Sequence, residues 1–237
     1  MGMRIARDFA SMGWMVGAAA RRRERLDELK AEFPDRIVTR TIDVTADDAI
    51  DRLHELVDAM GGMDTMFYAA GVGWNDPSLN AERTDVTVET NVAGFTRFVD
   101  AAYHYFAEHA TAERRGQIAA ISSVGGTKGI GASAVYSASK RYQWTYLEAI
   151  EQLSRNQRLP IDVTDIRPGF VDTPLLGKAA SAYPLIMSID YAAPRIERAI
   201  LRRRHVKVID WRWACVVALW RCVPRRLWRR LNLAFPD

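Results

Sequence analysis

The sequence predicts an α/β fold built on one doubly wound parallel sheet. Short, almost continuously apolar runs alternate with longer amphipathic patterns along most of the 237 residues. This alternation implies right-handed crossovers between parallel strands, and such strands are expected where helices cover both faces of a sheet. An apolar content of 49% is ordinary for a globular domain of this length. We expect one domain at 1–209 and a separate segment at 210–237.

The expected elements follow one another in order. Strands are expected at 14–20, 37–44, 63–70, 118–123, 163–167 and 206–209. Helices are expected at 22–33, 46–60, 83–108, 133–154 and 192–203, and a helical pattern through Phe9 and Met12 opens the chain. Apolar residues recur every three or four positions in 46–60, the spacing of an amphipathic helix. Pro34 ends the helix at 22–33, because proline cannot continue the hydrogen-bonding pattern.

The stretch from Tyr136 to Lys140 is the most informative for function. Positions i and i+4 share a helix face, so Lys140 is expected beside Tyr136. A cation near a phenol favours the phenolate, so we expect the pKa of Tyr136 to fall from about 10 toward the range of an acid/base catalyst. Ser123 lies thirteen residues upstream and is suited to hydrogen-bond a carbonyl oxygen. The alternative is an exposed tyrosine with a solvated lysine, which the upstream Ser122-Ser123 pair makes less favourable.

With these motifs in order, residues 1 to about 209 resemble the short-chain dehydrogenase/reductase family, which has a Rossmann-like fold. The resemblance implies a catalytic tetrad of Asn91, Ser123, Tyr136 and Lys140. It also implies cofactor contacts from Gly2, Asp43, Val44, Ala70, Gly71, Tyr136, Lys140, Pro168, Gly169, Val171 and Thr173. Ala69 departs from the family pattern, which has asparagine there, and the change removes a side-chain hydrogen bond.

The resemblance also implies a mechanism, in which hydride transfer accompanies proton transfer. In the reductive direction Tyr136 donates a proton to the carbonyl oxygen, and Ser123 stabilises the negative charge that develops there. Lys140 lowers the pKa of Tyr136 and holds the nicotinamide ribose. Asn91 supports a water chain that restores the proton through Lys140. The hydride chemistry belongs to the cofactor, whereas the protein supplies orientation and charge.

Arginines at the end of the first expected strand bear on the choice of cofactor. NAD sites usually carry Asp or Glu at this position, whereas Arg21 and Arg22 stand here. Arginine binds a 2′-phosphate through a charge-assisted fork, so we expect a preference for NADP(H), with NAD(H) as the other possibility. Arg21 is the first candidate ligand and Arg22 the second. The alternative is that these arginines begin a solvated helix.

The family pattern opens with a strand and a Gly-rich turn, and Gly2 aligns with the last glycine of that turn. Without that strand, the two strands beside it would have unpaired edges. Two interpretations compete. Either the chain begins at an internal methionine of a longer protein, or the shortened chain is the product and its cofactor binding is impaired. The intact tetrad favours the first.

The segment 210–237 is rich in tryptophan and arginine. Trp228 and Leu231 fall on one side of an expected helix after Pro224, and Arg225, Arg226, Arg229 and Arg230 fall on the other. This pattern is typical of a helix that lies at an anionic membrane surface. The alternative is a helical hairpin packed on the domain or across a homodimer. Nucleic acid is not expected as a partner, because the aromatic residues do not lie between the basic ones.

We expect an NADP(H)-dependent oxidoreductase that interconverts a carbonyl and a secondary alcohol. The substrate loop is placed at 175–188, and its apolar residues suggest a hydrophobic substrate. The expected substrate contacts are Ser123, Leu175, Tyr183 and Met187, and Trp74 is a candidate for the same pocket. The alternative from another class is a catalytically silent, membrane-associated binding protein on the same fold.

Other features bear on location and assembly. Cys215 and Cys222 would lie about 10 Å apart on one helix, which is too far for a disulfide and suits a reducing cytoplasmic setting. The basic C-terminal segment places the protein at the inner face of the membrane in the membrane interpretation. The histidines show no metal-ligand spacing, and neither a signal peptide nor a bilayer-spanning apolar run is present. The resemblance implies a homodimer or homotetramer, paired through the helices that carry Asn91 and Tyr136.

Overall fold

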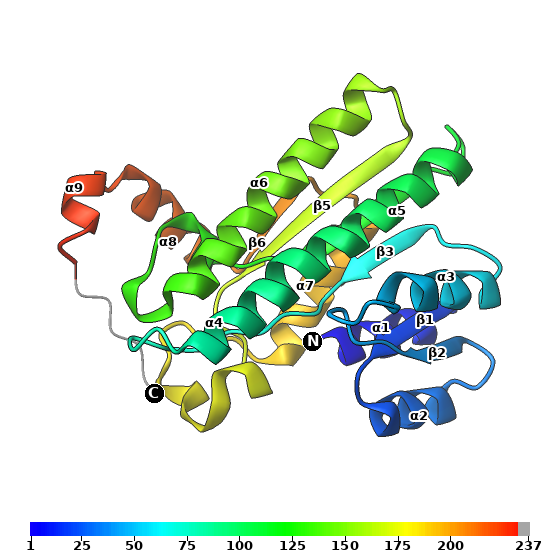
Figure 1. The fold of residues 1–237 in the computed structure, drawn as a ribbon, viewed down its shortest axis with the longest axis horizontal. Helices are drawn as coiled ribbons and strands as arrows, with labels where there is room; N and C mark the ends of the chain where they lie inside the picture. The colour runs from blue at the N-terminus through cyan, green and yellow to red at the C-terminus, as the bar shows by residue number, and fades with distance from the viewer. Residues whose placement is uncertain (232–237) are drawn as a thin grey trace.

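The computed structural model describes residues 1–231, with the side chains of 178–181 outside the description. Its strands are β1 (Val16–Ala20), β2 (Ile37–Thr41), β3 (Thr65–Tyr68), β4 (Gly116–Ile121), β5 (Ile161–Pro168) and β6 (Val206–Ile209). Every strand pairing is parallel, and each strand overlaps an apolar run that predicted it. The α/β fold with a parallel sheet is confirmed (Figure 1).

The helices before the active site are α1 (Gly2–Ser11), α2 (Arg23–Glu32), α3 (Ala49–Ala59), α4 (Ala81–Val88) and α5 (Phe95–His109). Those that follow are α6 (Ala134–Asn156), α7 (Ile189–Leu201), α8 (Trp211–Cys222) and α9 (Arg225–Trp228). The helix expected at 83–108 is interrupted, because a π-helical turn at Glu89–Gly94 joins α4 to α5. Such turns widen a helix locally and occur often at functional sites.

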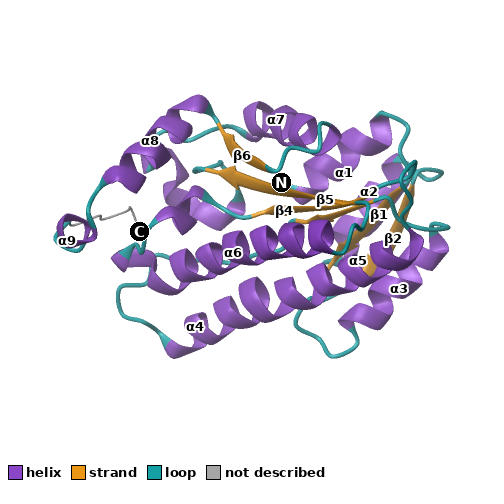
Figure 2. Cartoon of the chain, turned by 90° about the horizontal axis from the view of Figure 1, so that it is seen from above, coloured by secondary structure: helices purple, strands orange, loops and turns teal. Residues whose placement is uncertain are grey.

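Helices cover both faces of the sheet (Figure 2). One core cluster joins α3, α5 and α6 to the sheet, and its fully buried members include Phe95, Phe106 and Leu147. A second cluster joins α1, α7 and α8 to the opposite face through residues such as Ile5, Ile166 and Ile196. Burying each of these side chains contributes about 1.5–3 kcal/mol, so the two clusters hold the strand ends in fixed positions.

The sheet is divided between β1 and β3. Strands β1 and β2 form one ladder, and β3, β4, β5 and β6 form another in that order. The expectation of two strands with unpaired facing edges is therefore met in the described residues. Helix α1 begins near the end of β3, since a Cβ added to Gly2 would lie 3.4 Å from Ala69 Cβ.

The described part of the C-terminal segment packs on the domain. Trp213 of α8 is buried against Gly169, where an added Cβ would lie 2.2 Å from its ring. The Trp228 indole donates to the Gly129 carbonyl at 2.7 Å, and Lys128 Nζ donates to the Val223 carbonyl at 3.0 Å. These contacts agree with the packed alternative for 210–231, while the predictions for 232–237 lie outside the described residues. No helix within residues 1–231 has the length and apolar character needed to cross a bilayer.

Candidate active site

Ser123 and Tyr136 meet at the carboxyl end of β4. Ser123 follows β4 directly, and Tyr136 lies in the first turn of α6. The Ser123 hydroxyl lies close enough to the Tyr136 phenol to lower the pKa of that phenol. Two glycines bring backbone close to the phenol ring: a Cβ on Gly73 would lie 2.4 Å from Tyr136 Cδ2, and one on Gly125 would lie 3.4 Å from Cε1. The tyrosine is therefore held in one position by backbone rather than by flexible side chains.

The predicted lowering of the Tyr136 pKa is wrong for this structure. Burial raises the pKa of Tyr136, and the nearby Ser123 hydroxyl opposes that effect only in part. Lys140 Nζ lies 5.7 Å from the centroid of the Tyr136 ring, and its described hydrogen bonds go to other groups. Desolvation therefore outweighs the attraction of the cation, and Tyr136 is a neutral acid here.

Lys140 is buried on the same helix, with 4% of its surface exposed. Its Nζ donates to the Ile121 carbonyl at 3.2 Å and to Gln143 Oε1 at 3.0 Å. Burial lowers the pKa of Lys140 to about 8, and the charge of Asp165 opposes the change. Sequence reasoning missed Gln143, although a polar residue three positions after Lys140 shares its helix face and was a usable signal.

Asn91 lies in the π-helical turn and is 0% exposed. Its amide accepts from the Val72 N–H at 2.9 Å and donates to the Val72 carbonyl at 2.7 Å. It also donates to Ser139 Oγ at 3.1 Å, while its main-chain carbonyl accepts from Gln143 Nε2 at 2.9 Å. Asn91 thus ties the loop after β3 to α6. Its support of a water chain stays a prediction.

A buried ionic network lies behind Ser123. Arg167 Nε donates to Asp165 Oδ2 at 2.6 Å, and Ser122 donates to the same carboxylate. Burial raises the pKa of Asp165 despite these partners. The Arg167 guanidinium lies 3.6 Å from the centroid of the Trp144 ring, and the Trp144 indole donates to the Ser123 carbonyl at 3.1 Å. The network fixes the backbone of Ser123. Its sequence signal was the pair of opposite charges, Asp165 and Arg167, at alternate positions near the end of β5.

The predicted dinucleotide contacts line one edge of the sheet. Arg21 is exposed at the end of β1, with Nη1 4.0 Å from Asp43 Oδ2, and Arg22 precedes α2. Asp43 accepts from the Thr45 N–H at 3.0 Å. These groups lie at the carboxyl ends of strands, where dinucleotides bind in sheets of this kind. They fit a nicotinamide cofactor. No group of three or more metal-binding side chains occurs among the side chains described.

The remaining predicted cofactor contacts differ in whether backbone or side chain is available to a ligand. Gly2 opens α1, whose N-terminal N–H groups suit a phosphate. A Cβ on Gly71 would lie 3.4 Å from both Asn91 Oδ1 and Lys140 Nζ, so backbone passes close to the catalytic groups. Val44, Ala70, Gly169 and Thr173 are partly buried, Pro168 is buried, and Val171 is only 4% exposed. Val171 pairs with Met187 in a β-bridge, which leaves its backbone rather than its side chain for a ligand.

The structure corrects the prediction that Met187 contacts substrate. Met187 is 2% exposed and belongs to the core cluster under α7. Tyr183 packs on Phe170 with ring centroids 4.5 Å apart, whereas Leu175 is exposed. Sequence reasoning could not separate these cases, because a loop residue that packs inward and one that faces a ligand are both apolar.

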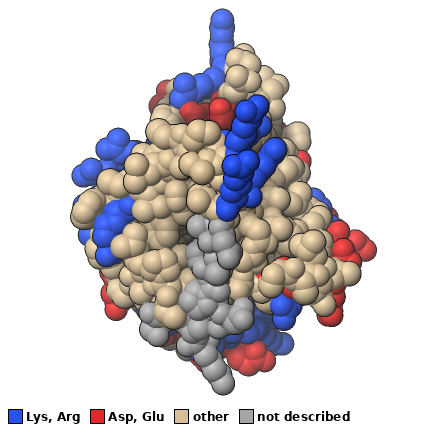
Figure 3. Space-filling view, turned by 90° about the vertical axis from the view of Figure 1, so that its left-hand side faces the viewer, with Lys and Arg blue, Asp and Glu red and all other residues tan. Residues whose placement is uncertain are grey.

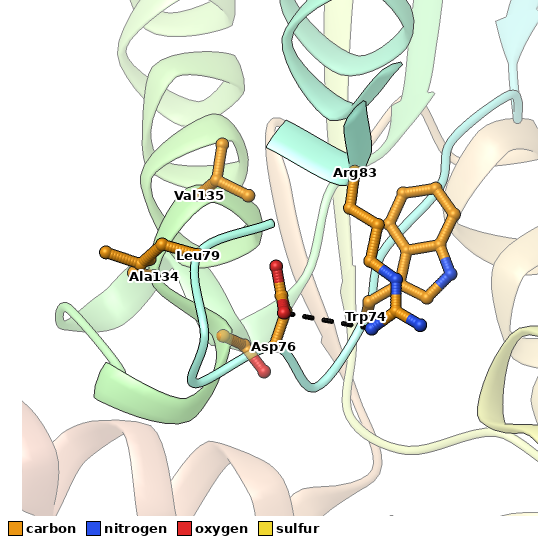
Figure 4. A pocket seen from close by; sticks show the side chains of 7 residues that line it. Trp74, Asp76, Leu79, Arg83, Ala134 and Val135 are labelled. Carbon is orange, nitrogen blue, oxygen red and sulfur yellow. Dashed lines mark ion pairs between the residues drawn. The ribbon is translucent and has the colours of Figure 1, made fainter. Parts of the chain in front are cut away.

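A shallow surface depression lies between the loop after β3 and the start of α6 (Figure 4). Its lining residues are Trp74, Asp76, Leu79, Arg83, Ser133, Ala134 and Val135. Arg83 Nη1 lies 3.7 Å from Asp76, which is 5% exposed. Trp74 was a candidate from the sequence, whereas Asp76 and Leu79 were missed because the loop at 75–80 has no periodic pattern.

Comparison with known proteins identifies the family. Residues 1–184 match the short chain dehydrogenase family. An uncharacterised oxidoreductase of Mycobacterium tuberculosis is 30% identical over 240 residues, which cover 97% of this chain and 92% of the relative. A farnesol dehydrogenase of Aedes aegypti is 31% identical over 186 residues, which cover 74% of this chain and 75% of that protein.

The fold has a solved counterpart as well. The crystal structure of a 3-ketoacyl-(acyl-carrier-protein) reductase from Brucella melitensis, complexed with NADH, superimposes with a TM-score of 0.76. It is 21% identical in sequence, and the match covers 89% of this chain and 90% of that one. Together with the geometry at Tyr136, these matches establish that the chain belongs to the short chain dehydrogenase family and is an NAD(P)-dependent dehydrogenase or reductase.

Proposed function

We propose that this protein is an NADP(H)-dependent oxidoreductase that interconverts a carbonyl and a secondary alcohol on a hydrophobic substrate. The observation that carries the proposal is the meeting of Ser123 and Tyr136 around Gly125, with buried Lys140 on the same helix as Tyr136. This arrangement supports proton transfer to or from a substrate oxygen.

Each side chain has a distinct role. A bound nicotinamide supplies the hydride in reduction and accepts it in oxidation. Tyr136 gives its phenolic proton to the carbonyl oxygen in reduction, so that the product is a neutral alcohol. Ser123 donates a hydrogen bond to the same oxygen as its negative charge develops. Lys140 stabilises the phenolate left on Tyr136, and together these groups would hold the ribose and the carbonyl in place.

The state of Tyr136 favours the reductive direction. Burial raises the pKa of the Tyr136 phenol, so the proton needed for reduction is present throughout the neutral range. Oxidation of an alcohol requires the phenolate instead and is expected to accelerate as the pH rises. We therefore expect this site to reduce carbonyl groups near pH 7.

Two features support the proposed ligands. Arg21 is 67% exposed and has one loose ion pair, with Asp43 at 4.0 Å, so it can turn to a 2′-phosphate. Trp74, Leu79 and Val135 contribute apolar surface to the shallow depression next to the start of α6, which agrees with a hydrophobic substrate. A relative named as a farnesol dehydrogenase agrees with an apolar alcohol.

Replacing Tyr136 with phenylalanine tests the proposal. We expect Tyr136→Phe to lose about 100-fold to 10,000-fold in turnover with NADPH and a panel of apolar ketones, since the proton donor is gone. NADPH affinity should remain. Tyr142→Phe is the matched control, because Tyr142 hydrogen-bonds Thr96 at 2.8 Å on the outer side of α6. Turnover that survives in Tyr136→Phe would contradict the role of Tyr136 as proton donor, whereas absence of turnover in the wild type would favour the catalytically silent binding protein.

We also propose that the protein is cytoplasmic and touches an anionic membrane surface through its C-terminal end. Cys215 and Cys222 are free and exposed on α8, which suits a reducing compartment. Leu227 and Leu231 are 53% and 46% exposed beside the α9 arginines. Trp228 is turned onto Gly129 instead, so the apolar contact would be narrower than the sequence pattern suggests. A homodimer or homotetramer paired through the α4, α5 and α6 surface is part of the same proposal.

A further inference from the structure

Gln143 connects two groups of the active site that lie on different elements. Its side chain is 0% exposed. Oε1 accepts from Lys140 Nζ at 3.0 Å, and Nε2 donates to the main-chain oxygen of Asn91 at 2.9 Å. A chain of hydrogen bonds thus runs from an ammonium through a neutral amide to a backbone carbonyl, and every member is buried.

The π-helical turn explains why the Asn91 carbonyl can take part. In a regular α-helix the Phe95 N–H would donate to Asn91, four residues earlier. Here the Phe95 N–H donates to Val92 instead. The Asn91 oxygen therefore points to α6 and accepts from Gln143, so the break in the helix and the buried glutamine belong to one arrangement.

The surroundings of Lys140 show what Gln143 contributes. The titratable groups that face its ammonium are Tyr136 on α6 and Asp165 on β5. Asp165 is already engaged by Arg167 and Ser122. A buried ammonium needs acceptors to offset its lost hydration, and the described ones are Gln143 and the Ile121 carbonyl. Gln143 thus stabilises the charged form without adding a charge.

We propose that Gln143 is a positioning residue of this active site, whose side-chain amide links Lys140 to the Asn91 carbonyl. The inference rests on the proposed function, because it assigns proton transfer to Tyr136 and Lys140. The amide carries no proton between its partners. It fixes where the ammonium lies and how readily that ammonium gives up its proton.

Direct titration of Lys140 tests this without a substrate. The protein is labelled with lysine that carries ¹³C at Cε, and the Lys140 signal is assigned by its loss in Lys140→Arg. Gln143→Met removes both hydrogen bonds at similar volume, and we expect the pKa of Lys140 to fall by about one pH unit. Gln143→Glu puts a carboxylate beside the ammonium and should raise that pKa by a similar amount.

Gln117→Met is the matched control. Gln117 is also buried, and its Nε2 bridges Thr164 Oγ1 and the Ile200 carbonyl, both at 2.9 Å. It lies at the start of β4, at the opposite end of the strand from Ser123. This variant should lower the melting temperature but leave the titration of Lys140 unchanged. If Gln143→Met does not fold, the rise in Gln143→Glu still decides the question.

The titration of Lys140 tests the role of Gln143, and turnover in Tyr136→Phe tests the proposed function. A pKa of Lys140 that stays within about 0.2 of wild type in both Gln143 variants would overturn the positioning role. Opposite movements in the two variants would support it. Where a ketone substrate is available, the pH profile of kcat should move in the same two directions. Full turnover in Tyr136→Phe would remove the proposed function while the titration result stood.

Discussion

Arg21 stands at the end of β1 with little to hold it. Its one described ion pair, with Asp43, is 4.0 Å long, and both side chains are largely in water. Exposed pairs of this kind contribute about 0–1 kcal/mol, so the guanidinium gives up little when it turns to another anion. A 2′-phosphate offers two or more charges and a matching geometry.

This predicts a selective effect on cofactor affinity. Arg21→Ala with Arg22→Ala should weaken NADPH binding by about tenfold or more and leave NADH binding nearly unchanged. Titration of tryptophan fluorescence with each nucleotide measures both. Arg23→Ala is the control, because Arg23 already pairs with Asp27 inside α2 at 3.6 Å. Equal losses for both nucleotides would contradict the preference for NADP(H).

Single residues of the site were foreseen to different degrees. The tetrad positions followed from the family resemblance, and the structure brings Ser123, Tyr136 and Lys140 together at one strand end. The pKa of Tyr136 could not be foreseen, because it depends on how much water the fold removes around the ring. The prediction that Met187 contacts substrate was wrong for a related reason, since sequence shows that a side chain is apolar but not which way it faces.

Helices α1 and α7 meet through acidic side chains. Glu197 of α7 is 6% exposed and lies beside Asp8 of α1. Burial, reinforced by Asp8, raises the pKa of Glu197 to about 7, and Arg4 opposes the change. Because the folded state holds the Glu197 proton more tightly than the unfolded chain, this group stabilises the fold fully only below about pH 4.3, and the contribution is lost as the pH rises through about 7.

Glu197→Gln should therefore stabilise the protein at high pH. The amide mimics the protonated acid and can donate to Asp8 at every pH. We expect the melting temperature to rise by about 2–4 °C at pH 8, and the difference from wild type to close near pH 4. Thermal unfolding by circular dichroism at several pH values measures this. Glu148→Gln, on the exposed side of α6, should show no such trend, and a constant difference for Glu197→Gln would contradict the assignment.

At this scale the sequence predicted the elements better than their junctions. The apolar runs located each described strand, because burial on both faces leaves a strong signal. The π-helical turn at Glu89–Gly94 was not foreseen, since it depends on contacts with Val72 and Gln143 that are remote in sequence. Helix α9 proved shorter than its amphipathic pattern suggested.

Positive charge gathers at one end of the molecule. Figure 3 shows Lys and Arg side chains on the face that carries the C-terminal end of the described chain. Arg225, Arg226, Arg229 and Arg230 are all exposed there. Each basic residue near an anionic leaflet contributes about 1 kcal/mol of attraction, so the four together outweigh the modest apolar contact of Leu227 and Leu231.

Membrane binding should accordingly depend on these arginines. Changing Arg225, Arg226, Arg229 and Arg230 to glutamine should reduce cosedimentation with phosphatidylglycerol vesicles by at least about tenfold. Charge replacement is a cleaner test than deletion from Asp210 onward, because deletion would remove buried Trp213. The control changes the same number of exposed arginines elsewhere, at Arg155, Arg158, Arg202 and Arg204. Equal cosedimentation of the two variants would contradict a membrane role for this end.

The aromatic rings of the C-terminal segment form a continuous series that ends in the loop after β5. The series runs through Trp228, Trp220, Trp213, Phe170 and Tyr183, with adjacent ring centroids 4.5 to 6.4 Å apart. The Trp213 indole also donates to the Leu185 carbonyl at 3.1 Å. The tail and the loop therefore behave as one module. A chimera of two relatives should therefore take the tail and the loop from the same parent, because exchanging one alone would break the ring contacts between them.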